Sequence, residues 1–93
     1  MIKSFADKET QKIWNRRYSK KLPEDIQKRG RQKLILLDSA ATIEDLRVPS
    51  GNRLEKLKGS REGQRSIRIN QQWRVCFTWH GGDAYDVEIT DYH

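Results

Sequence analysis

The hydrophobic spacing of the chain changes near Arg53, and this change constrains the fold most strongly. Downstream of Arg53, apolar and polar residues alternate, which is typical of β-strands with one buried face. The stretch "RSIRIN" places Ile67 and Ile69 on one face. The stretch "WRVCFTWH" places Trp73, Val75, Phe77 and Trp79 on one face and Arg74, Cys76, Thr78 and His80 on the other. After a predicted hairpin turn at residues 81–83, the last strand has Tyr85, Val87 and Ile89 on one face and Asp86, Glu88 and Thr90 on the other.

Upstream of Arg53 the pattern favours helices. Asp7 is a candidate N-cap for a helix through Trp14, and Pro23-Glu24-Asp25 is typical of the start of a second helix. In that second helix the predicted buried face comprises Ile26, Leu34, Leu37 and Ala41. Thr42 precedes a short capped turn, "VPSGN" at 48–52 is expected to end helical structure, and residues 2–5 are a candidate edge strand. These elements predict an α+β fold in one domain over residues 1–93, with helices covering one face of a small, largely antiparallel sheet.

The composition excludes several classes of protein. No stretch reaches the ~20 apolar residues that span a bilayer, and the N-terminus lacks the apolar segment of a signal peptide. A single cysteine, Cys76, cannot form an intramolecular disulfide and suits a reducing compartment. One cysteine and two histidines, His80 and His93, are too few for a structural zinc site. We therefore expect a cytoplasmic protein without metal, cofactor or membrane association. Its net charge of +6 favours a polyanionic partner.

The charges are segregated along the sequence. Seven cations fall within residues 53–74: Arg53, Lys56, Lys58, Arg61, Arg65, Arg68 and Arg74. Residues 83–93 contain four acids and no Lys or Arg. Two interpretations remain open with similar weight. The charges form cross-strand ion pairs on a solvated face, each contributing little. Alternatively, they form a cationic groove with a titratable rim that binds a phosphodiester backbone.

The residue types indicate what chemistry such a groove would perform. Arg68 and Arg74 alternate onto the polar sheet face, where planar guanidinium groups suit phosphate oxygens and the charge that grows on them in a transition state. RNA cleavage by its own 2′-OH then needs only a proton acceptor and a proton donor. Asp91, Tyr92 and His93 are candidates, as is Lys58 if neighbouring cations favour its neutral form. Each also has a structural alternative: a frayed terminus for His93, ring packing for Tyr92, an ion pair for Asp91.

Four stretches carry a resemblance to a known family. "GNRLEKLKGSREGQRSIRINQQWRVCFTW" (51–79), the ending "DVEITDYH" and the segments "MIKSF" and "LLDSAATIEDLR" resemble HigB-type toxins of the RelE/ParE superfamily, in the subgroup close to GraT. The resemblance implies two N-terminal helices on a curved, mostly antiparallel sheet. It implies a toxin that enters the A site of the 70S ribosome and cleaves mRNA without a metal, leaving a 2′,3′-cyclic phosphate. It also implies a HigA-type helix-turn-helix antitoxin, a toxin–antitoxin heterotetramer, and binding to operator DNA only through the antitoxin.

The resemblance also implies roles for individual residues. Asp91, Tyr92 and His93 match the functional terminal trio of the family, Lys58 a basic residue of its groove, and Arg74 the arginine at the phosphate. We add Arg68, Arg65, Arg61 and Glu55 as candidate substrate-binding residues. Glu55 departs from the pattern, because some relatives carry a catalytic histidine there and a glutamate is a weaker base at neutral pH. Two alternatives use the same fold: a toxin that acts on DNA gyrase, and a non-enzymatic RNA- or ribosome-binding module.

Overall fold

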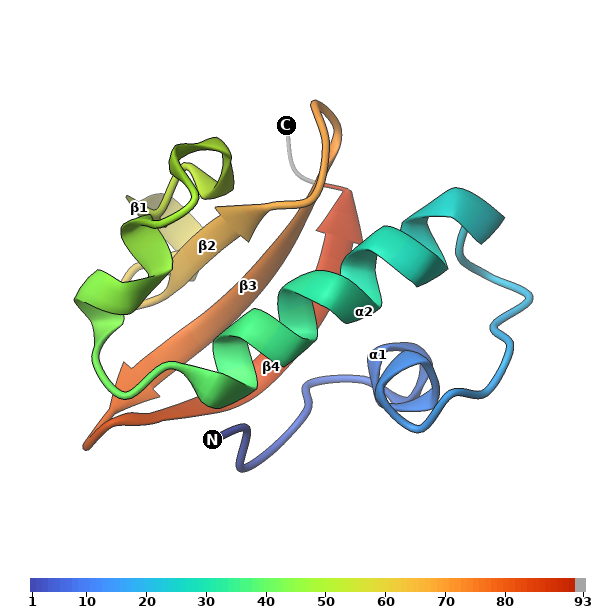
Figure 1. The fold of residues 1–93 in the computed structure, drawn as a ribbon, viewed down its shortest axis with the longest axis horizontal. Coiled ribbons are helices and arrows are strands. Elements are labelled where there is room, and N and C mark those ends of the chain that lie inside the picture. Colours follow the sequence, from blue (N-terminus) through green and yellow to red (C-terminus); the bar gives the residue numbers. More distant parts are fainter. Residues whose placement is uncertain (92–93) are drawn as a thin grey trace.

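The computed structural model, which describes residues 1–91, has two α-helices packed on one face of a four-stranded antiparallel sheet (Figure 1). The helices are α1 (Lys8–Trp14) and α2 (Glu24–Ser39). The strands, in sheet order, are β1 (Glu55–Lys56), β2 (Arg65–Arg68), β3 (Trp73–His80) and β4 (Asp83–Asp91). Three short 3-10 helices, η1 (Ile43–Arg47), η2 (Ser50–Asn52) and η3 (Gly59–Arg61), lie in the connections. The predicted α+β class is confirmed, and the described part contains no helix long and apolar enough to cross a bilayer.

Both helices begin where the sequence predicted. The Asp7 carboxylate accepts a hydrogen bond from the backbone N–H of Thr10, which caps α1. Pro23 precedes α2, and its first turn carries the predicted pair of acids. The far end of α2 differs from expectation, since the helix stops at Ser39 and the backbone extends at Ala40. The buried position is therefore Ala40, whereas Ala41, predicted on the buried face, is exposed.

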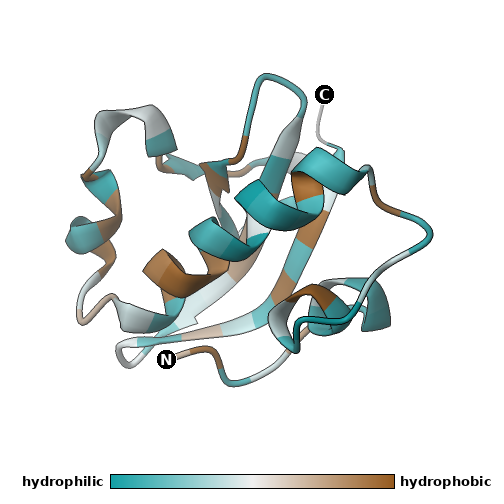
Figure 2. Cartoon of the chain, turned by 45° about the vertical axis from the view of Figure 1, so that its right-hand side comes forward, coloured by the Kyte–Doolittle hydropathy of each residue, from teal (hydrophilic) through white to brown (hydrophobic). Residues whose placement is uncertain are grey.

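The core lies between the helices and the inner face of the sheet, and Figure 2 shows hydrophobic residues recurring along α2 and along the strands beneath it. Its fully buried members include Ile26, Leu34, Leu37, Ile67, Val75, Phe77 and Val87. Gly30 permits α2 to approach β4 closely, because a Cβ atom there would lie 3.0 Å from the Ile89 side chain. This contact explains a glycine inside a helix, where it otherwise costs about 1 kcal/mol.

The last strand contains an irregularity that the sequence pattern did not predict. Asp86 has a left-handed backbone with φ of 52°, and the register between β3 and β4 shifts at this point. Ala84 then pairs with Trp79 on the helix-covered face, while Tyr85 pairs with Thr78 on the polar face. The prediction that Tyr85 shares a face with Val87 and Ile89 is therefore wrong, because the extra residue reverses the alternation.

Three further segments differ from expectation. The sequence predicted three strands, and the structure adds β1, whose two residues are both exposed. Residues 2–5 form two isolated parallel bridges to β4, Ile2 with Ala84 and Phe5 with Val87, in place of a continuous strand. In "VPSGN", helical structure does not end completely, since Ser50–Asn52 forms η2. The capped turn predicted at Thr42 is confirmed, because Thr42 and Asp45 form a capping box at the start of η1.

Candidate nucleic-acid interface

Arg74 is the best-anchored charge on the polar face of the sheet. It lies on β3, is buried, and its guanidinium has three protein partners. Nη1 donates to Ser66 Oγ at 2.9 Å, and Nη2 donates to the backbone carbonyl of Arg53 at 3.2 Å and to Glu55 Oε1 at 3.1 Å. These contacts come from three different segments, so they fix the orientation of the planar group. Fixed donors of this kind stabilise a developing negative charge without having to reorganise.

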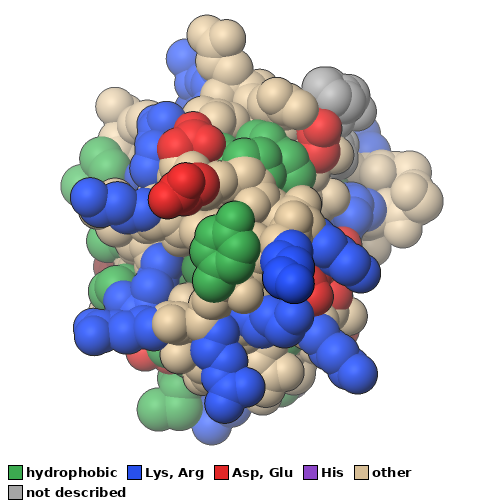
Figure 3. All heavy atoms as spheres, turned by 90° about the vertical axis from the view of Figure 1, so that its right-hand side faces the viewer, with side chains coloured by type: hydrophobic (Ala, Val, Ile, Leu, Met, Phe, Trp, Pro, Cys, Tyr) green, Lys and Arg blue, Asp and Glu red, His purple; other side chains and the backbone are tan. Residues whose placement is uncertain are grey.

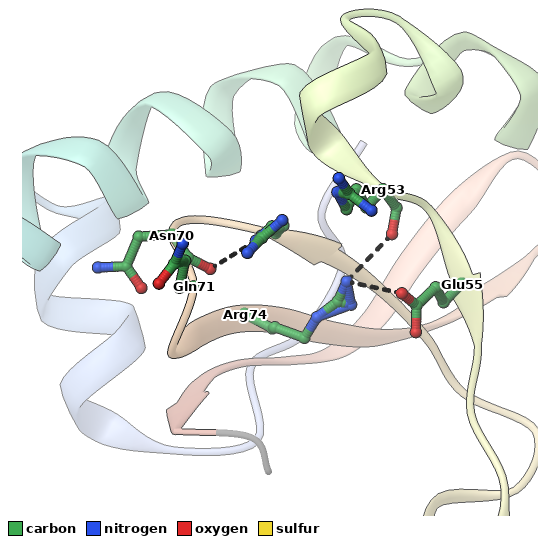
Figure 4. Close-up of a pocket in the computed structure, with 6 residues that line it drawn as sticks. Arg53, Glu55, Asn70, Gln71 and Arg74 are labelled. Carbon is green, nitrogen blue, oxygen red and sulfur yellow. Dashed lines mark hydrogen bonds and ion pairs between the residues drawn. The ribbon is translucent and has the colours of Figure 1, made fainter.

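Arg74 forms part of a depression of about 300 Å³ on this face, lined by Arg53, Glu55, Arg68, Asn70, Gln71 and Arg74 (Figure 4). We call it the arginine depression. Arg68 pairs with Arg74 across β2 and β3, and Arg68 Nε donates to the carbonyl oxygen of Asn70 at 3.0 Å. Three guanidinium groups and one carboxylate therefore surround the same space. This excess of positive charge is suited to an anion such as a phosphodiester.

Glu55 contributes the only carboxylate among the described residues that line the arginine depression. β1 positions it, since Glu55 pairs with Ser66 of β2, and Ser66 in turn contacts Arg74. The Glu55 side chain is 54% exposed, whereas that of Arg74 is 10% exposed. The ion pair thus joins the fixed guanidinium of Arg74 to the carboxylate of Glu55, which is exposed enough to change its side-chain rotamer toward solvent.

Lys58 and Arg65, two of the predicted site residues, lie elsewhere. Both line a separate depression of about 390 Å³ together with Lys56, Leu57, Glu62, Gly63 and Gln64. Arg65 pairs with Phe77, so it alternates onto the opposite sheet face from Arg68 and Arg74. Lys58 is exposed at the start of η3. The structure therefore does not bring these two residues together with Arg74 in the arginine depression.

Arg61 is paired within the protein. Its Nη1 lies 3.1 Å from Glu88 Oε1 and 3.1 Å from Gln64 Oε1, and both ion-pair partners are less than a third exposed. This ion pair joins η3 to β4, so it is an internal pair but not one between two strands, whereas the alternative interpretation of the charges predicted cross-strand pairs. The neighbouring Cys76 is fully buried, and its burial raises the pKa of the thiol, which favours the neutral form. Cys76 is therefore unsuited to act as a nucleophile.

Asp91 lies at the end of β4, where it pairs with Trp73, one residue beyond the pair of Thr90 with Arg74. By alternation it leaves the sheet on the face opposite to Arg74. Its Oδ2 accepts a hydrogen bond from Gln72 Nε2 at 2.8 Å, which links the end of β4 to the turn before β3. The predictions for Tyr92 and His93 lie outside the described residues. Within residues 1–91, no group of three or more His, Cys, Asp and Glu side chains is arranged to hold a metal ion.

The sequence did not single out four residues that shape the arginine depression. Arg53 was counted among the cations but not among the site residues, although it caps η2 with a left-handed φ of 45°. Asn70 and Gln71 belong to the turn between β2 and β3, and Ser66 is a buried partner of Arg74. A signal was available for Ser66, because alternation in "RSIRIN" places it on the same face as Arg68.

The family profile and two similar proteins all carry the name HigB. The profile of a HigB-like toxin family, described as "RelE-like toxin of type II toxin-antitoxin system HigB", matches residues 3–93. "Toxin HigB-1" of Vibrio cholerae is 41% identical over 68 residues, which cover 73% of this chain and 72% of that protein. "Endoribonuclease HigB" of Proteus vulgaris is 34% identical over 93 residues, the full length of both.

Solved structures share the fold at low sequence identity. A YoeB–YefM complex from Staphylococcus aureus matches with a TM-score of 0.62 at 18% identity, covering 100% of this chain and 98% of that chain. A YafQ mutant from E. coli gives a TM-score of 0.62 at 13% identity, covering 98% of this chain and 93% of that chain. The architecture is therefore that of the RelE-like toxins.

Proposed function

The chain belongs to the HigB-like family of RelE-like toxins from type II toxin–antitoxin systems. From this premise we propose that it is an endoribonuclease that cleaves mRNA in the A site of the 70S ribosome. The observation that carries the proposal is the arginine depression, in which a buried, triply anchored Arg74 lies beside Arg68 and Arg53. Support also comes from the full-length relative in Proteus vulgaris that is named an endoribonuclease. The proposed site of action is the cytoplasm, where mRNA and ribosomes meet.

The proposed reaction is a transesterification in which the 2′-OH of the RNA attacks the adjacent phosphorus. The new P–O2′ bond forms as the P–O5′ bond breaks, which gives a 2′,3′-cyclic phosphate and a 5′-hydroxyl. Arg74 binds the nonbridging phosphate oxygens and stabilises the charge they gain in the transition state, with Arg68 and Arg53 beside it. Because the nucleophile belongs to the substrate and the guanidinium groups balance the charge, the reaction requires no metal.

Proton transfer completes the reaction. One group takes the proton of the 2′-OH and another gives a proton to the 5′-oxygen. We assign one of these roles to His93, with Tyr92 positioning the base or the phosphate. Asp91 leaves the sheet on the face opposite to Arg74, so its proposed role is to orient this terminal trio. Asp91 is held by Gln72 at the end of β4, which supports a defined place for the start of this trio. Lys58, Arg65 and Arg61 lie outside the arginine depression, so we assign them to flanking stretches of the RNA.

Glu55 is the group that substrate must displace. Its Oε1 accepts a hydrogen bond from Arg74 Nη2 at 3.1 Å, at the position where a phosphate oxygen would bind. Because the Glu55 side chain is exposed, it can move away. In the absence of RNA it neutralises part of the positive charge in the arginine depression. On this basis Glu55 tunes substrate binding and is not the base of the reaction.

A protein antitoxin is the proposed partner. We infer a HigA-type antitoxin with a helix-turn-helix, which neutralises the toxin and carries the complex to operator DNA. The toxin itself then binds DNA only through that partner. A related fold supports the general arrangement, because a solved YoeB–YefM structure from Staphylococcus aureus is described as a heterotetrameric toxin–antitoxin complex.

Primer-extension mapping of transcripts after induction tests the proposal. The expected result is a set of new mRNA 5′ ends within ribosome-occupied coding sequence, absent when Arg74→Lys is induced to the same level. A purified assay then compares free mRNA with ribosome-bound mRNA. Equal cleavage of both would contradict ribosome dependence. Growth arrest without new mRNA ends, together with lost supercoiling by gyrase, would favour the gyrase-targeting alternative.

A further inference from the structure

A second cationic surface lies on the helical side of the molecule, away from the arginine depression. Residues 8–31 contain nine Lys and Arg against three acids, a net charge of +6 that equals the charge of the whole chain. Figure 3 shows Lys and Arg side chains gathered around exposed hydrophobic side chains on the side of the molecule that carries α1, the linker and the start of α2. A second concentration of positive charge, besides that of residues 53–74, therefore lies on elements that the proposed cleavage chemistry does not use.

Two adjoining depressions hollow this surface. One, of about 290 Å³, is lined by Lys8, Gln11, Lys12, Asn15 and Arg17. The other, of about 380 Å³, includes Arg16, Arg17, Tyr18, Lys28 and Arg31 in its lining, so Arg17 forms a wall of both. Among the described side chains that line them there is no carboxylate. One cation of this surface is already paired, because Lys12 Nζ lies 3.3 Å from the Glu9 carboxylate beside it.

We call the surface formed by Lys8, Lys12, Arg16, Arg17, Lys28 and Arg31, with Tyr18 among them, the helix-side basic surface. Tyr18 is 67% exposed. This exposure leaves most of the apolar area of the ring uncovered, whereas a tyrosine packed inside a protein buries that area. An exposed aromatic ring between guanidinium groups is the arrangement with which proteins stack an unpaired base and hold its phosphates. Tyr18 is thus placed to contact a base, and its cationic neighbours are placed to contact the backbone.

The linker between α1 and α2 (residues 15–23), which carries Tyr18, is held in place by partly buried hydrogen bonds. Ser19 is fully buried, and its Oγ donates to Glu9 Oε1 at 2.6 Å. Gln27 accepts from the backbone N–H of Ser19 and donates to the carbonyl oxygens of Ser19 and Leu22, each near 2.8–2.9 Å. Arg16 is fixed in a left-handed conformation with φ of 61°, which non-glycine residues adopt rarely. The linker is therefore preorganised, which lowers the entropy cost of binding.

Arg31 adds an unsatisfied donor. Its guanidinium lies 5.8 Å from the centroid of the Trp14 ring, and its buried Nε–H has no hydrogen-bond partner in the part of the chain that the structure describes. A buried donor without an acceptor is unfavourable. A phosphate at the neighbouring depression would bring negative charge to this guanidinium.

From these observations we propose that the helix-side basic surface binds RNA, as a single-stranded or bulged segment. Its base stacks on Tyr18, and its phosphates contact Lys8, Arg17 and Lys28. The helices cover the apolar face of the sheet, whereas Arg68 and Arg74 lie on the other face. One short strand in the arginine depression therefore does not also reach Tyr18. The occupant is a segment of a folded RNA that presents a second contact, independent of the bond to be cut.

Fluorescence anisotropy with a labelled 2′-O-methyl RNA hairpin that carries a bulge tests this proposal. The methyl group blocks attack by the 2′-oxygen, so the measurement reports binding alone. Tyr18→Ala is expected to raise Kd about tenfold or more, the contribution typical of base–aromatic stacking, while Tyr18→Phe keeps the ring and the affinity. The double change Lys8→Ala/Arg17→Ala is expected to reduce the slope of log K against log salt by about 1.4, or about 0.7 for each lost contact.

The matched control is Lys3→Ala/Arg47→Ala, which removes the same charge from exposed positions outside both depressions. The proposal is overturned if two results are found together: Tyr18→Ala binds the RNA as tightly as this control, and Lys8→Ala/Arg17→Ala has the same salt slope as this control. Loss of antitoxin affinity with unchanged RNA affinity would also overturn it, since the surface would then be a protein docking site. A parent protein that binds this RNA through Tyr18 but cleaves no mRNA would leave the inference standing and contradict the proposed nuclease.

Discussion

Arg68 and Arg74 are direct partners on the antiparallel strands β2 and β3, so two cationic side chains leave the polar sheet face at one point. Like charges in this relationship repel and reduce the stability of a sheet. The repulsion is relieved inside the protein by Glu55 on Arg74 and by the Asn70 carbonyl on Arg68. A bound phosphodiester would relieve it further, and this relationship is the basis of the first prediction.

Arg74→Lys is expected to lower kcat/KM for mRNA cleavage by about 10²–10³, the usual effect of removing one transition-state donor. Lysine keeps the charge but lacks the planar fork that reaches Ser66, Glu55 and the phosphate together. Single-turnover cleavage of ribosome-bound mRNA measures the change. Unaltered cleavage by Arg74→Lys would show that only the charge, and not the geometry, of this residue matters.

Ser66→Ala tests the anchoring of Arg74. Removal of the buried hydroxyl takes away the Nη1 contact and should cost about 1–3 kcal/mol in free energy of unfolding, measured by denaturant titration. The cleavage rate should also fall by about tenfold, or 1.4 kcal/mol in activation free energy, because the guanidinium is less well fixed. Exposed Ser60→Ala is the control and should change neither quantity. A loss of stability with normal cleavage would limit Ser66 to a structural role.

Glu55→Gln is expected to lower KM for RNA severalfold and to leave kcat nearly unchanged. The substitution removes the carboxylate that competes with phosphate for Arg74 while it preserves the shape of the side chain. Steady-state cleavage at fixed ionic strength separates the two parameters. If instead kcat falls by about 10² or more with KM unchanged, Glu55 is the general base, and its assignment as a displaced anion is wrong.

Glu9 is expected to contribute to acid unfolding. Hydrogen bonding from Ser19, opposed in part by burial and aided by Lys12, lowers the pKa of the Glu9 carboxyl in the folded state. A lowered folded pKa gives stability that is present above the unfolded pKa and is lost as pH falls through the folded pKa. Glu9→Gln should therefore lower Tm at neutral pH. The Tm difference between this variant and the parent should become smaller as pH falls below about 5. The exposed Glu62→Gln change is the control for thermal unfolding across this range.

Gly30→Leu is expected to destabilise the fold by about 1–3 kcal/mol, the usual cost of overpacking. A Cβ atom at this position already lies 3.0 Å from Ile89 and 3.5 Å from Ile69, so a larger side chain would push α2 away from β4. Chemical denaturation measures the change, and Gln32→Leu on the exposed side of the same helix is the control. Equal stability of the two variants would show that α2 can shift at little cost.

Alternation of residue types predicted most of the sheet and part of the site. It placed Arg68 and Arg74 on one face correctly because β2 and β3 are regular between these residues. The same alternation also groups Arg65 with Ile67, so the position of Arg65 away from Arg74 was predictable from "RSIRIN". It failed at Tyr85, since an aspartate can adopt the left-handed conformation of Asp86 and no residue type marks the bulge.

The contacts around Arg74 were less accessible to prediction. β1 has two residues, too few for a period of two to be visible, and both are exposed and charged. Its register with β2 depends on the long connection over residues 57–64, which includes η3. The Glu55–Arg74 ion pair and the position of Arg53 follow from that register. The helix-side basic surface depended on how the linker folds over α1, which the buried Ser19 and Gln27 contacts determine.

The bridges from Ile2 and Phe5 to β4 join the first residues of the chain to residues that are synthesised about eighty positions later. The Met1 amino group likewise lies 3.3 Å from the Asp83 carboxylate. At about 5–20 residues per second, a nascent chain waits several seconds before these contacts can form. The sheet that carries Arg74 remains incomplete until β4 has been made, because Thr90 of β4 pairs with Arg74.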